Sequence, residues 1–232
     1  MSTILVTAFE PYDEWEENAS WLALVELTRH LPPELQLVTR KYPVDFSKIR
    51  SLLARDLEAA PLLAIHLGQA PGASRIALEA VALNIRGHVN DGRDLSQTAA
   101  GRPLVHPDGA SILAADGPPA YRARLPLAEL AGKLNAIGIP SKVSFHAGTF
   151  LCNACLYWSM HLAHQMELPT RSLFLHIPLA PQQVAGDRRD LPSMTSAAVA
   201  GAIGLIAAEL GENADLPVEQ KTVSCSASQI IS

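Results

Sequence analysis

The residues with the most distinctive chemistry lie between Val143 and His161, where the sequence reads VSFHAGTFLCNACLYWSMH. We expect a short strand from Lys142 to Phe145, a turn at Ala147-Gly148-Thr149, and a helix whose first turn contains Cys152. The unpaired N–H groups of a first helical turn and the positive end of the helix dipole both favour the thiolate, the nucleophilic form of cysteine. The same N–H groups can bind an oxyanion. Cys152 is therefore a candidate nucleophile; the alternative is a small buried apolar residue, as most free cysteines are.

A histidine and a glutamate elsewhere in the chain have the contexts that such a nucleophile requires. His176 lies near the carboxyl end of an expected buried strand, Ser172 to Ile177, and ligands bind at that edge of open α/β sheets. It can serve as a general base for Cys152, or be a half-buried histidine bonded to backbone. Glu79 is the only acidic residue from Leu62 to Ile85. A carboxylate there either is buried and pairs with a cation, such as an imidazolium, or lies on the exposed face of an amphipathic segment.

Two other patterns near this cysteine allow different chemistry. Cys152 and Cys155 form a C-x-x-C, but the element order of a thioredoxin-type redox protein is missing and Cys155 falls on the apolar side of its helix. His161 and His164 lie three residues apart, with His146 nearby and no carboxylate at ligand spacing, so we expect no metal site. There is no glycine-rich phosphate loop and no G-x-S-x-G motif.

Alternating strands and helices must position these residues. Besides the strands named above, we expect strands at Ile4 to Ala8, Leu35 to Val44 and Leu62 to Leu67. We expect helices at Ala19 to Arg29, Phe46 to Glu58, Leu127 to Ala136, and Met194 to Leu210 with Ser193 as its cap. The run from Arg75 to Asn84 fits a strand or a helix equally well. The alternation predicts an α/β fold with a mainly parallel sheet and helices on both faces.

Length and composition indicate one α/β domain. The chain has 232 residues, of which 48% are hydrophobic and 18% are charged. We expect a single catalytic domain over residues 1–211 and a polar, poorly ordered tail over residues 212–232. In the polar segment from Arg86 to Ala120, apolar residues recur at neither helical nor strand spacing, which is typical of a lid or binding loop.

Charge, apolar runs and cysteine count limit the partners and the compartment. The net charge of -5 includes no basic run, which argues against nucleic acid or an anionic membrane as a partner. The start, Met1 to Val6, resembles a first strand more than a signal peptide, and the apolar run from Ala197 to Ala208 is too short to span a bilayer. Three cysteines, an odd number, fit a reducing cytoplasm.

Five segments of the chain occur in the same order in a known family. They are LVTAFEPY with the later Asn18-Ala19-Ser20, HLGQAPGASRIALEAVALN, the element from Gly117 to Pro126, VSFHAGTFLCN, and FLHIPLAPQQ. The chain resembles the pyroglutamyl peptidase I family of cysteine peptidases from about Ile4 to Leu210, and the Ala-Gly-x-Phe-x-Cys-Asn motif around Cys152 is the most specific part.

The resemblance implies a site, a fold and a substrate class. It makes Cys152 the nucleophile, His176 the general base and acid, and Glu79 the carboxylate that orients the histidine. It also implies a pocket for a five-membered lactam, lined by Phe9, Tyr12, Phe150 and Leu151 with Gln69 close by. Members of the family are three-layer α/β/α sandwiches with a mixed, mainly parallel central sheet. They are soluble, free of cofactor and metal, often homo-oligomers (tetramers or dimers), and act on peptides with an N-terminal pyroglutamyl residue.

Two alternatives to this function remain, of which one rests on departures from the family pattern. Tyr12 and Asp13 stand where the family has Phe and Gly, Ala77 where Ser or Thr is usual, Ala80 where a basic residue is usual, and His146 where a small hydroxyl residue is usual. One alternative is therefore a degenerate relative that binds a pyrrolidone or a peptide N-terminus without turnover. A nucleoside phosphorylase of the same layered architecture is the other, although the sequence shows no clear phosphate-binding cluster.

Overall fold

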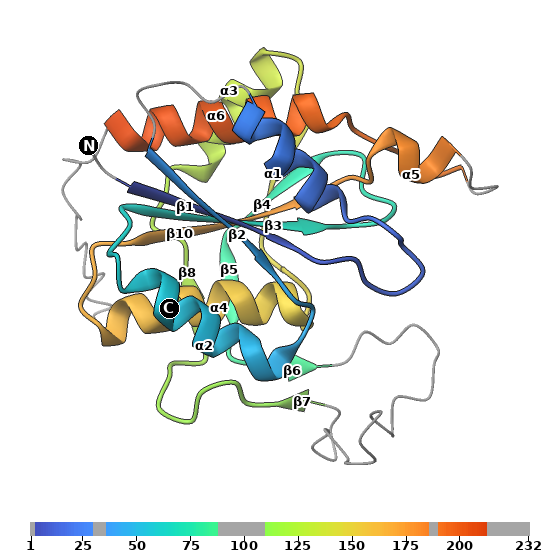
Figure 1. Cartoon of the computed structure of the whole chain (residues 1–232). Helices are drawn as coiled ribbons and strands as arrows, with labels where there is room; N and C mark the ends of the chain where they lie inside the picture. The colour runs from blue at the N-terminus through green and yellow to red at the C-terminus, as the bar shows by residue number, and fades with distance from the viewer. Residues whose placement is uncertain (1–2, 30–35, 88–109, 186–189, 213–232) are drawn as a thin grey trace, which may run out of the picture.

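A six-stranded sheet forms the centre of the computed structural model, which describes residues 3–29, 36–87, 110–185 and 190–212. Its strands are β1 (Thr3–Phe9), β2 (Gln36–Tyr42), β3 (Leu63–Gln69), β4 (Ile76–Glu79), β9 (Ser141–Ser144) and β10 (Arg171–Ile177). Their order across the sheet is β2-β1-β3-β10-β4-β9 (Figure 1). β10, which comes last in the chain, therefore lies between β3 and β4.

The sheet is mixed and mainly parallel, as the sequence predicted. β2, β1, β3 and β10 run parallel to one another, β4 runs antiparallel to β10, and β9 runs parallel to β4. At the junction of β10 and β4, the carboxyl end of one strand meets the amino end of the other, and His176 lies opposite Ala77. This junction brings side chains from opposite strand directions to one edge of the sheet.

Helices cover both faces of the sheet in two layers (Figure 1). One layer is α1 (Ala19–Arg29), α3 (Leu127–Ala136) and α6 (Ser196–Glu212), and the other is α2 (Phe46–Leu57) and α4 (Leu151–Gln165). Alternate residues of β1 face the two layers: Ile4 and Val6 pack in the core beneath the first, and Leu5 in the core beneath the second. β1 is buried on both faces, which explains its continuous apolar run. The result is the expected three-layer α/β/α sandwich.

Shorter elements lie beside the main sheet. They are β5 (Val81–Leu83), β6 (Arg86–Gly87), β7 (Ala110–Ser111), β8 (Ala120–Arg122) and α5 (Pro181–Ala185). β5 pairs with β8, and β6 pairs with β7, both antiparallel. The ambiguous run from Arg75 to Asn84 is thus two strands, β4 and β5, separated at Ala80. Periodicity did not identify β4 because all four of its residues are buried.

The predicted helices are present, and one predicted cap is wrong. The expected bounds of α1 and α3 agree with the structure, whereas α6 begins at Ser196 instead of Met194. Its cap is Thr195, whose Oγ1 accepts a hydrogen bond from the Ala198 N–H at 3.2 Å, and not Ser193. Ser193 instead forms a β-bridge with Leu179, so its backbone is extended. That tertiary pairing overrides the local capping preference.

Several predictions fall outside the described residues. They concern most of the segment from Arg86 to Ala120, the tail over residues 212–232 beyond its first residue, and the third cysteine. The division into one catalytic domain and a tail therefore stays a prediction. Within the described ranges, none of the helices combines the length and the apolar character that crossing a bilayer requires.

Candidate active site

Cys152 is the second residue of α4, as the sequence predicted for its first turn. Phe150 caps the helix with extended backbone, and the first backbone bond of the helix runs from the Ala154 N–H to the Phe150 carbonyl at 3.1 Å. The chain enters through Gly148, whose φ of 76° is a conformation that glycine adopts without strain. Cys152 therefore lies in the turn whose N–H groups have no carbonyl of a preceding turn to bind, and it is partly exposed.

Asn153 fixes this helix start to the segment that follows β4. Its Oδ1 accepts a hydrogen bond from the Leu83 N–H at 2.8 Å, and its Nδ2 donates to the carbonyls of Leu83 and Ile85, both at 2.9 Å. The side chain is fully buried and all its hydrogen-bonding groups are used. Asn153 directly follows Cys152 in the Ala-Gly-x-Phe-x-Cys-Asn motif, yet sequence reasoning assigned it no role.

His176 lies between Glu79 and Cys152. Its Nδ1 is 2.8 Å from Oε1 of Glu79, a carboxyl group on the neighbouring strand that is only 2% exposed. An ionised carboxylate can only accept, so Nδ1 donates, and Nε2 is left for the Cys152 thiol, which lines the same cavity. This geometry gives the ring the tautomer that a general base toward sulfur requires.

The charges around His176 favour its protonated form. Burial alone lowers the pKa of the ring, but the charge of Cys152 and the hydrogen bonds to Cys152 and Glu79 outweigh it and raise the pKa to about 10. The proton therefore stays on the imidazole near neutral pH whenever the sulfur is ionised. The arrangement can form a thiolate–imidazolium pair, which supplies a nucleophile and an acid together.

Gly68, on β3, lets the sulfur approach the sheet. A Cβ at this position would lie 2.6 Å from the Phe174 ring and 3.0 Å from Sγ of Cys152. Any side chain larger than hydrogen would therefore displace one of these groups. The sequence motif HLGQ contains this glycine, but nothing in the motif alone indicates the contact.

All eight predicted site residues line one cavity of about 1330 Å³. They come from the ends of four strands, the loop after β1 and the start of α4, and they are Phe9, Tyr12, Gln69, Glu79, Phe150, Leu151, Cys152 and His176. The structure thus brings together residues that are up to 167 positions apart in the chain (176 minus 9). The aromatic rings of Phe9 and Phe150 give part of this cavity an apolar wall.

Gln69 presents an unpaired amide group to this cavity. Its Oε1 accepts hydrogen bonds from the Ala19 N–H at 2.8 Å and from Nε2 of Gln183 at 2.7 Å. Its own Nε2 is buried and has no hydrogen-bond partner among the described residues. A substrate carbonyl would satisfy that donor. Gln183, which holds the amide in this orientation, was not singled out from the sequence, although it ends the segment FLHIPLAPQQ.

Tyr12 places a hydroxyl group where a phenylalanine would have none. Its oxygen lies 3.5 Å from the backbone carbonyl of Gln69. Burial and, second, the charge of Cys152 raise the pKa of Tyr12 to about 12. The hydroxyl is therefore neutral at physiological pH and can donate a hydrogen bond inside the cavity.

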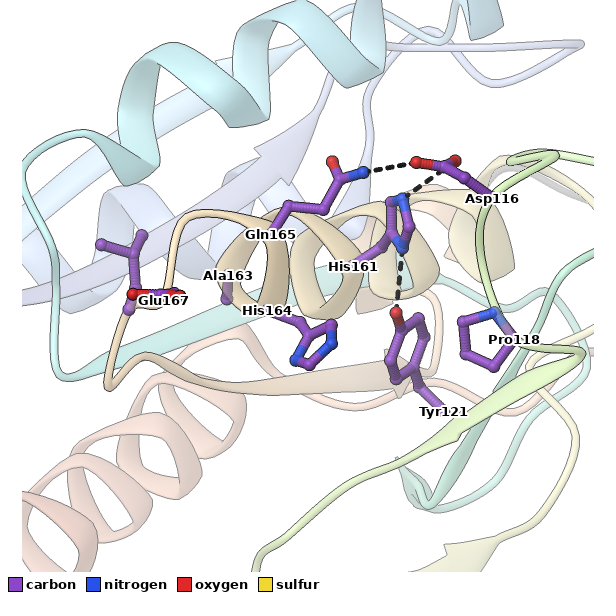
Figure 2. A pocket seen from close by; sticks show the side chains of 9 residues that line it. Asp116, Pro118, Tyr121, His161, Ala163, His164, Gln165 and Glu167 are labelled. Carbon is purple, nitrogen blue, oxygen red and sulfur yellow. Dashed lines mark hydrogen bonds and ion pairs between the residues drawn. The ribbon is translucent and has the colours of Figure 1, made fainter.

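A second, smaller cavity of about 650 Å³ lies near the other end of α4 (Figure 2). His161 projects into it: Nδ1 is 2.9 Å from the Tyr121 hydroxyl, and Nε2 is 3.6 Å from an Asp116 oxygen. None of its lining residues also lines the first cavity. Within the described residues, no group of three or more His, Cys, Asp or Glu side chains is placed to hold a metal ion.

Comparisons with known proteins agree on one family. Residues 2–210 match the family model described as pyroglutamyl peptidase. The chain is 36% identical over 187 residues to pyrrolidone-carboxylate peptidase 1 of Ralstonia nicotianae, covering 80% of this chain and 82% of that protein. It is 34% identical over 211 residues to the pyrrolidone-carboxylate peptidase of Pectobacterium atrosepticum, covering 90% and 93%.

Solved structures are similar over nearly the whole fold. The crystal structure of the pyrrolidone carboxyl peptidase from Fervidobacterium islandicum AW-1 superposes with a TM-score of 0.80 at 30% identity, covering 91% of this chain and 99% of that one. The structure of the pyrrolidone carboxyl peptidase from Thermococcus litoralis gives a TM-score of 0.77 at 29% identity, covering 90% of this chain and 93% of that one.

Proposed function

Because the chain belongs to the pyroglutamyl peptidase family, we propose that it hydrolyses the amide bond after an N-terminal pyroglutamyl residue, with Cys152, His176 and Glu79 as its catalytic residues. The observation that carries this assignment is the position of the His176 ring, which is hydrogen-bonded to Glu79 and lines one cavity together with Cys152, whose charge raises the pKa of the ring. Nothing in the comparisons favours the alternative of a relative that binds without turnover.

Acylation begins with attack of the Cys152 thiolate on the pyroglutamyl carbonyl carbon. The carbonyl oxygen then carries negative charge, which the N–H groups of the first turn of α4 can bind. As the C–N bond breaks, His176 gives its proton to the departing amine, and a thioester between the pyroglutamyl group and Cys152 remains. The raised pKa of His176, about 10, keeps that proton available near neutral pH.

Deacylation uses the same residues in reverse. His176, now neutral, takes a proton from water, and the resulting hydroxide attacks the thioester carbonyl. The C–S bond breaks, which releases pyroglutamate and regenerates the thiolate beside the imidazolium. Glu79 holds the ring through Nδ1 during both stages and stabilises its positive charge.

Specificity follows from the chemistry of the lactam. A pyroglutamyl residue has no free amine, so its ring offers a flat apolar body, one N–H donor and one C=O acceptor. We assign the apolar body to the wall formed by Phe9, Tyr12, Phe150 and Leu151, and the C=O to the unpaired Nε2 of Gln69. A ring without these groups would leave the Gln69 amide unpaired, which costs affinity.

A fluorogenic assay tests this function directly. The purified protein is incubated with the pyroglutamyl amide of 7-amino-4-methylcoumarin, and release of the coumarin is followed. Wild type should release it, and Cys152→Ser should not. No release by wild type, or equal release by the variant, contradicts the proposal.

Two further properties belong to this proposal. A thiol nucleophile works only when reduced, so we place the enzyme in the cytoplasm. The resemblance to oligomeric family members leads us to expect a homo-oligomer, a tetramer or dimer, which sedimentation of the purified chain would test.

A further inference from the structure

The cavity continues beyond His176 into a region that the pyroglutamyl ring does not use. The residues assigned to the ring come from the end of β1 and the loop after it, the end of β3, and the start of α4, and β1 and β3 lie on one side of β10. On the other side of β10 lie β4 and β9, and the same cavity is lined there by Arg75, Ala77, Lys142, Ser144 and His146. Because His176 protonates the departing amine, the leaving peptide must extend toward this second side.

The strand register shows how close the second side is to the reacting bond. Gly68, His176, Ala77 and Lys142 are aligned on β3, β10, β4 and β9. Aligned residues on neighbouring strands present their side chains to the same face, so Lys142 shares the face of His176 two strands away, which is about 10 Å. Between them stands Ala77, whose single methyl group leaves the space above it open.

Three side chains on this second side can bind negative charge. Lys142 and Arg75 are exposed, and neither has an ion-pair partner among the described residues. His146 accepts a hydrogen bond from the Gly148 N–H through Nδ1, at 2.8 Å. The neutral ring therefore carries its proton on Nε2, which is a donor.

Acidic residues of the cavity lie elsewhere. Glu10, Asp13 and Glu14 belong to the loop between β1 and α1, on the ring side. Among the described residues that line the cavity, the one carboxylate on the second side is Glu79, which is hydrogen-bonded to His176. The cavity is thus acidic where the lactam enters and basic where the rest of the peptide leaves.

We propose that Lys142, Arg75 and His146 form a carboxylate-binding subsite for the residue that follows pyroglutamate, an inference that rests on the proposed function. The carboxylate comes from an acidic side chain or, in a dipeptide, from the C-terminus. A C-terminal carboxylate oxygen lies about three bonds beyond the scissile nitrogen, and an acidic side chain adds about one or two bonds, at about 1.5 Å each. The four methylene groups of Lys142 allow its ammonium group to cover the rest of the distance from β9, two strands away.

Two matched pairs of peptides test the subsite. Pyroglutamyl-alanine with a free C-terminus is compared with its C-terminal amide, and pyroglutamyl-glutamate amide with pyroglutamyl-glutamine amide. Amine release by wild type should show kcat/KM about 3- to 10-fold higher for the charged member of at least one pair, since exposed ion pairs are individually weak. The pair that responds identifies the source of the carboxylate. The preference should shrink in 0.5 M NaCl.

Variants connect the preference to the named residues. Lys142→Gln and Arg75→Gln should each lower the charged-to-neutral ratio about 2- to 5-fold. Using a ratio within each variant removes any effect of a reduced active fraction. Lys142→Glu should bring the ratio below one. The control is Lys133→Gln, which makes the same charge change on α3, where Lys133 pairs with Glu129 and Glu209. Its ratio should equal that of wild type.

The outcomes separate this inference from the function on which it rests. If wild type releases no amine from any of the four peptides, the proposed function fails. If it hydrolyses charged and neutral peptides equally, or if Lys142→Gln, Arg75→Gln and Lys142→Glu all keep the wild-type ratio, the carboxylate subsite alone is overturned.

Discussion

Replacing Glu79 with Gln should lower the pKa of His176 while keeping its hydrogen bond. The amide oxygen of Gln can still accept from Nδ1, which now lies 2.8 Å from a Glu79 carboxylate oxygen. Only the negative charge is lost. A unit charge about 4 Å from the imidazolium, at the effective dielectric constant of such sites, is worth ~4 kcal/mol. Since one pKa unit corresponds to about 1.36 kcal/mol, the pKa of His176 should fall by about 3 units at most.

The sign of the change follows from which form of the ring each neighbour stabilises. Cys152 and Glu79 raise the pKa of His176 to about 10, against burial, which lowers it. Removing either charge leaves burial less opposed, so the imidazolium loses its proton at a lower pH. Cys152→Ser should lower the pKa at least as much as Glu79→Gln, because the charge of Cys152 is the largest of the raising influences.

NMR titration of the histidine Cε1–H signals measures this pKa directly. The chain has eight histidines, and the signal lost in His176→Gln assigns the relevant one. The alkaline limb of the pH profile of kcat/KM should move down with the NMR value in Glu79→Gln. A wild-type His176 that titrates near 6.5, or one that titrates at the same pH in wild type and both variants, would refute the proposed charge arrangement.

Three further substitutions test packing and stability. Gly68→Ala should lower kcat/KM about 100-fold, because the new methyl group would lie too close to the Phe174 ring and to the Cys152 sulfur, so the groups beside His176 must shift. Gly132→Ala on α3, where a new methyl group would have no neighbour within 4 Å, should keep wild-type activity. Asn153→Ala should lower the free energy of unfolding, measured in urea, by ~3 kcal/mol, since three hydrogen bonds to buried backbone are lost; a loss below ~1 kcal/mol would contradict this. Burial lowers the pKa of His66 to about 3, so the unfolded chain binds a proton below about pH 6.5 that the folded chain does not. As the pH is lowered from 6.5 to 3, the free energy of unfolding should therefore fall by up to ~1.4 kcal/mol per pH unit. It should fall less steeply in His66→Gln. Equal slopes of unfolding free energy against pH in the two proteins would contradict this.

Much of the fold could be predicted because its strands and helices differ in pattern. α1 and α3 have the predicted bounds, since breakers or charged residues end each apolar period. β4 could not be identified, because a strand buried on both faces has no alternation. Its antiparallel direction also leaves no trace in the sequence. It follows only from the tertiary structure, in which β10 separates it from β3.

Some residues of the candidate site could likewise be predicted from the sequence, and others could not. Cys152, His176 and Glu79 could be chosen because each is an exception to its local pattern: a cysteine in a first helical turn, a histidine in a buried strand, and an acid in an apolar run. Lys142 and Arg75 could not, because exposed cations are ordinary on any surface. Their significance depends on the register that aligns β9 with β10 across β4.

The place of β10 in the sheet has a consequence for biosynthesis. A ribosome delivers β1, β3, β4 and β9 before β10, so the growing sheet has a gap at its centre until residues 171–177 emerge. The same late segment carries His176, the imidazole that we propose as the base for Cys152. An unfinished chain can therefore contain the thiol and the carboxylate of the proposed site without the imidazole that lies between them.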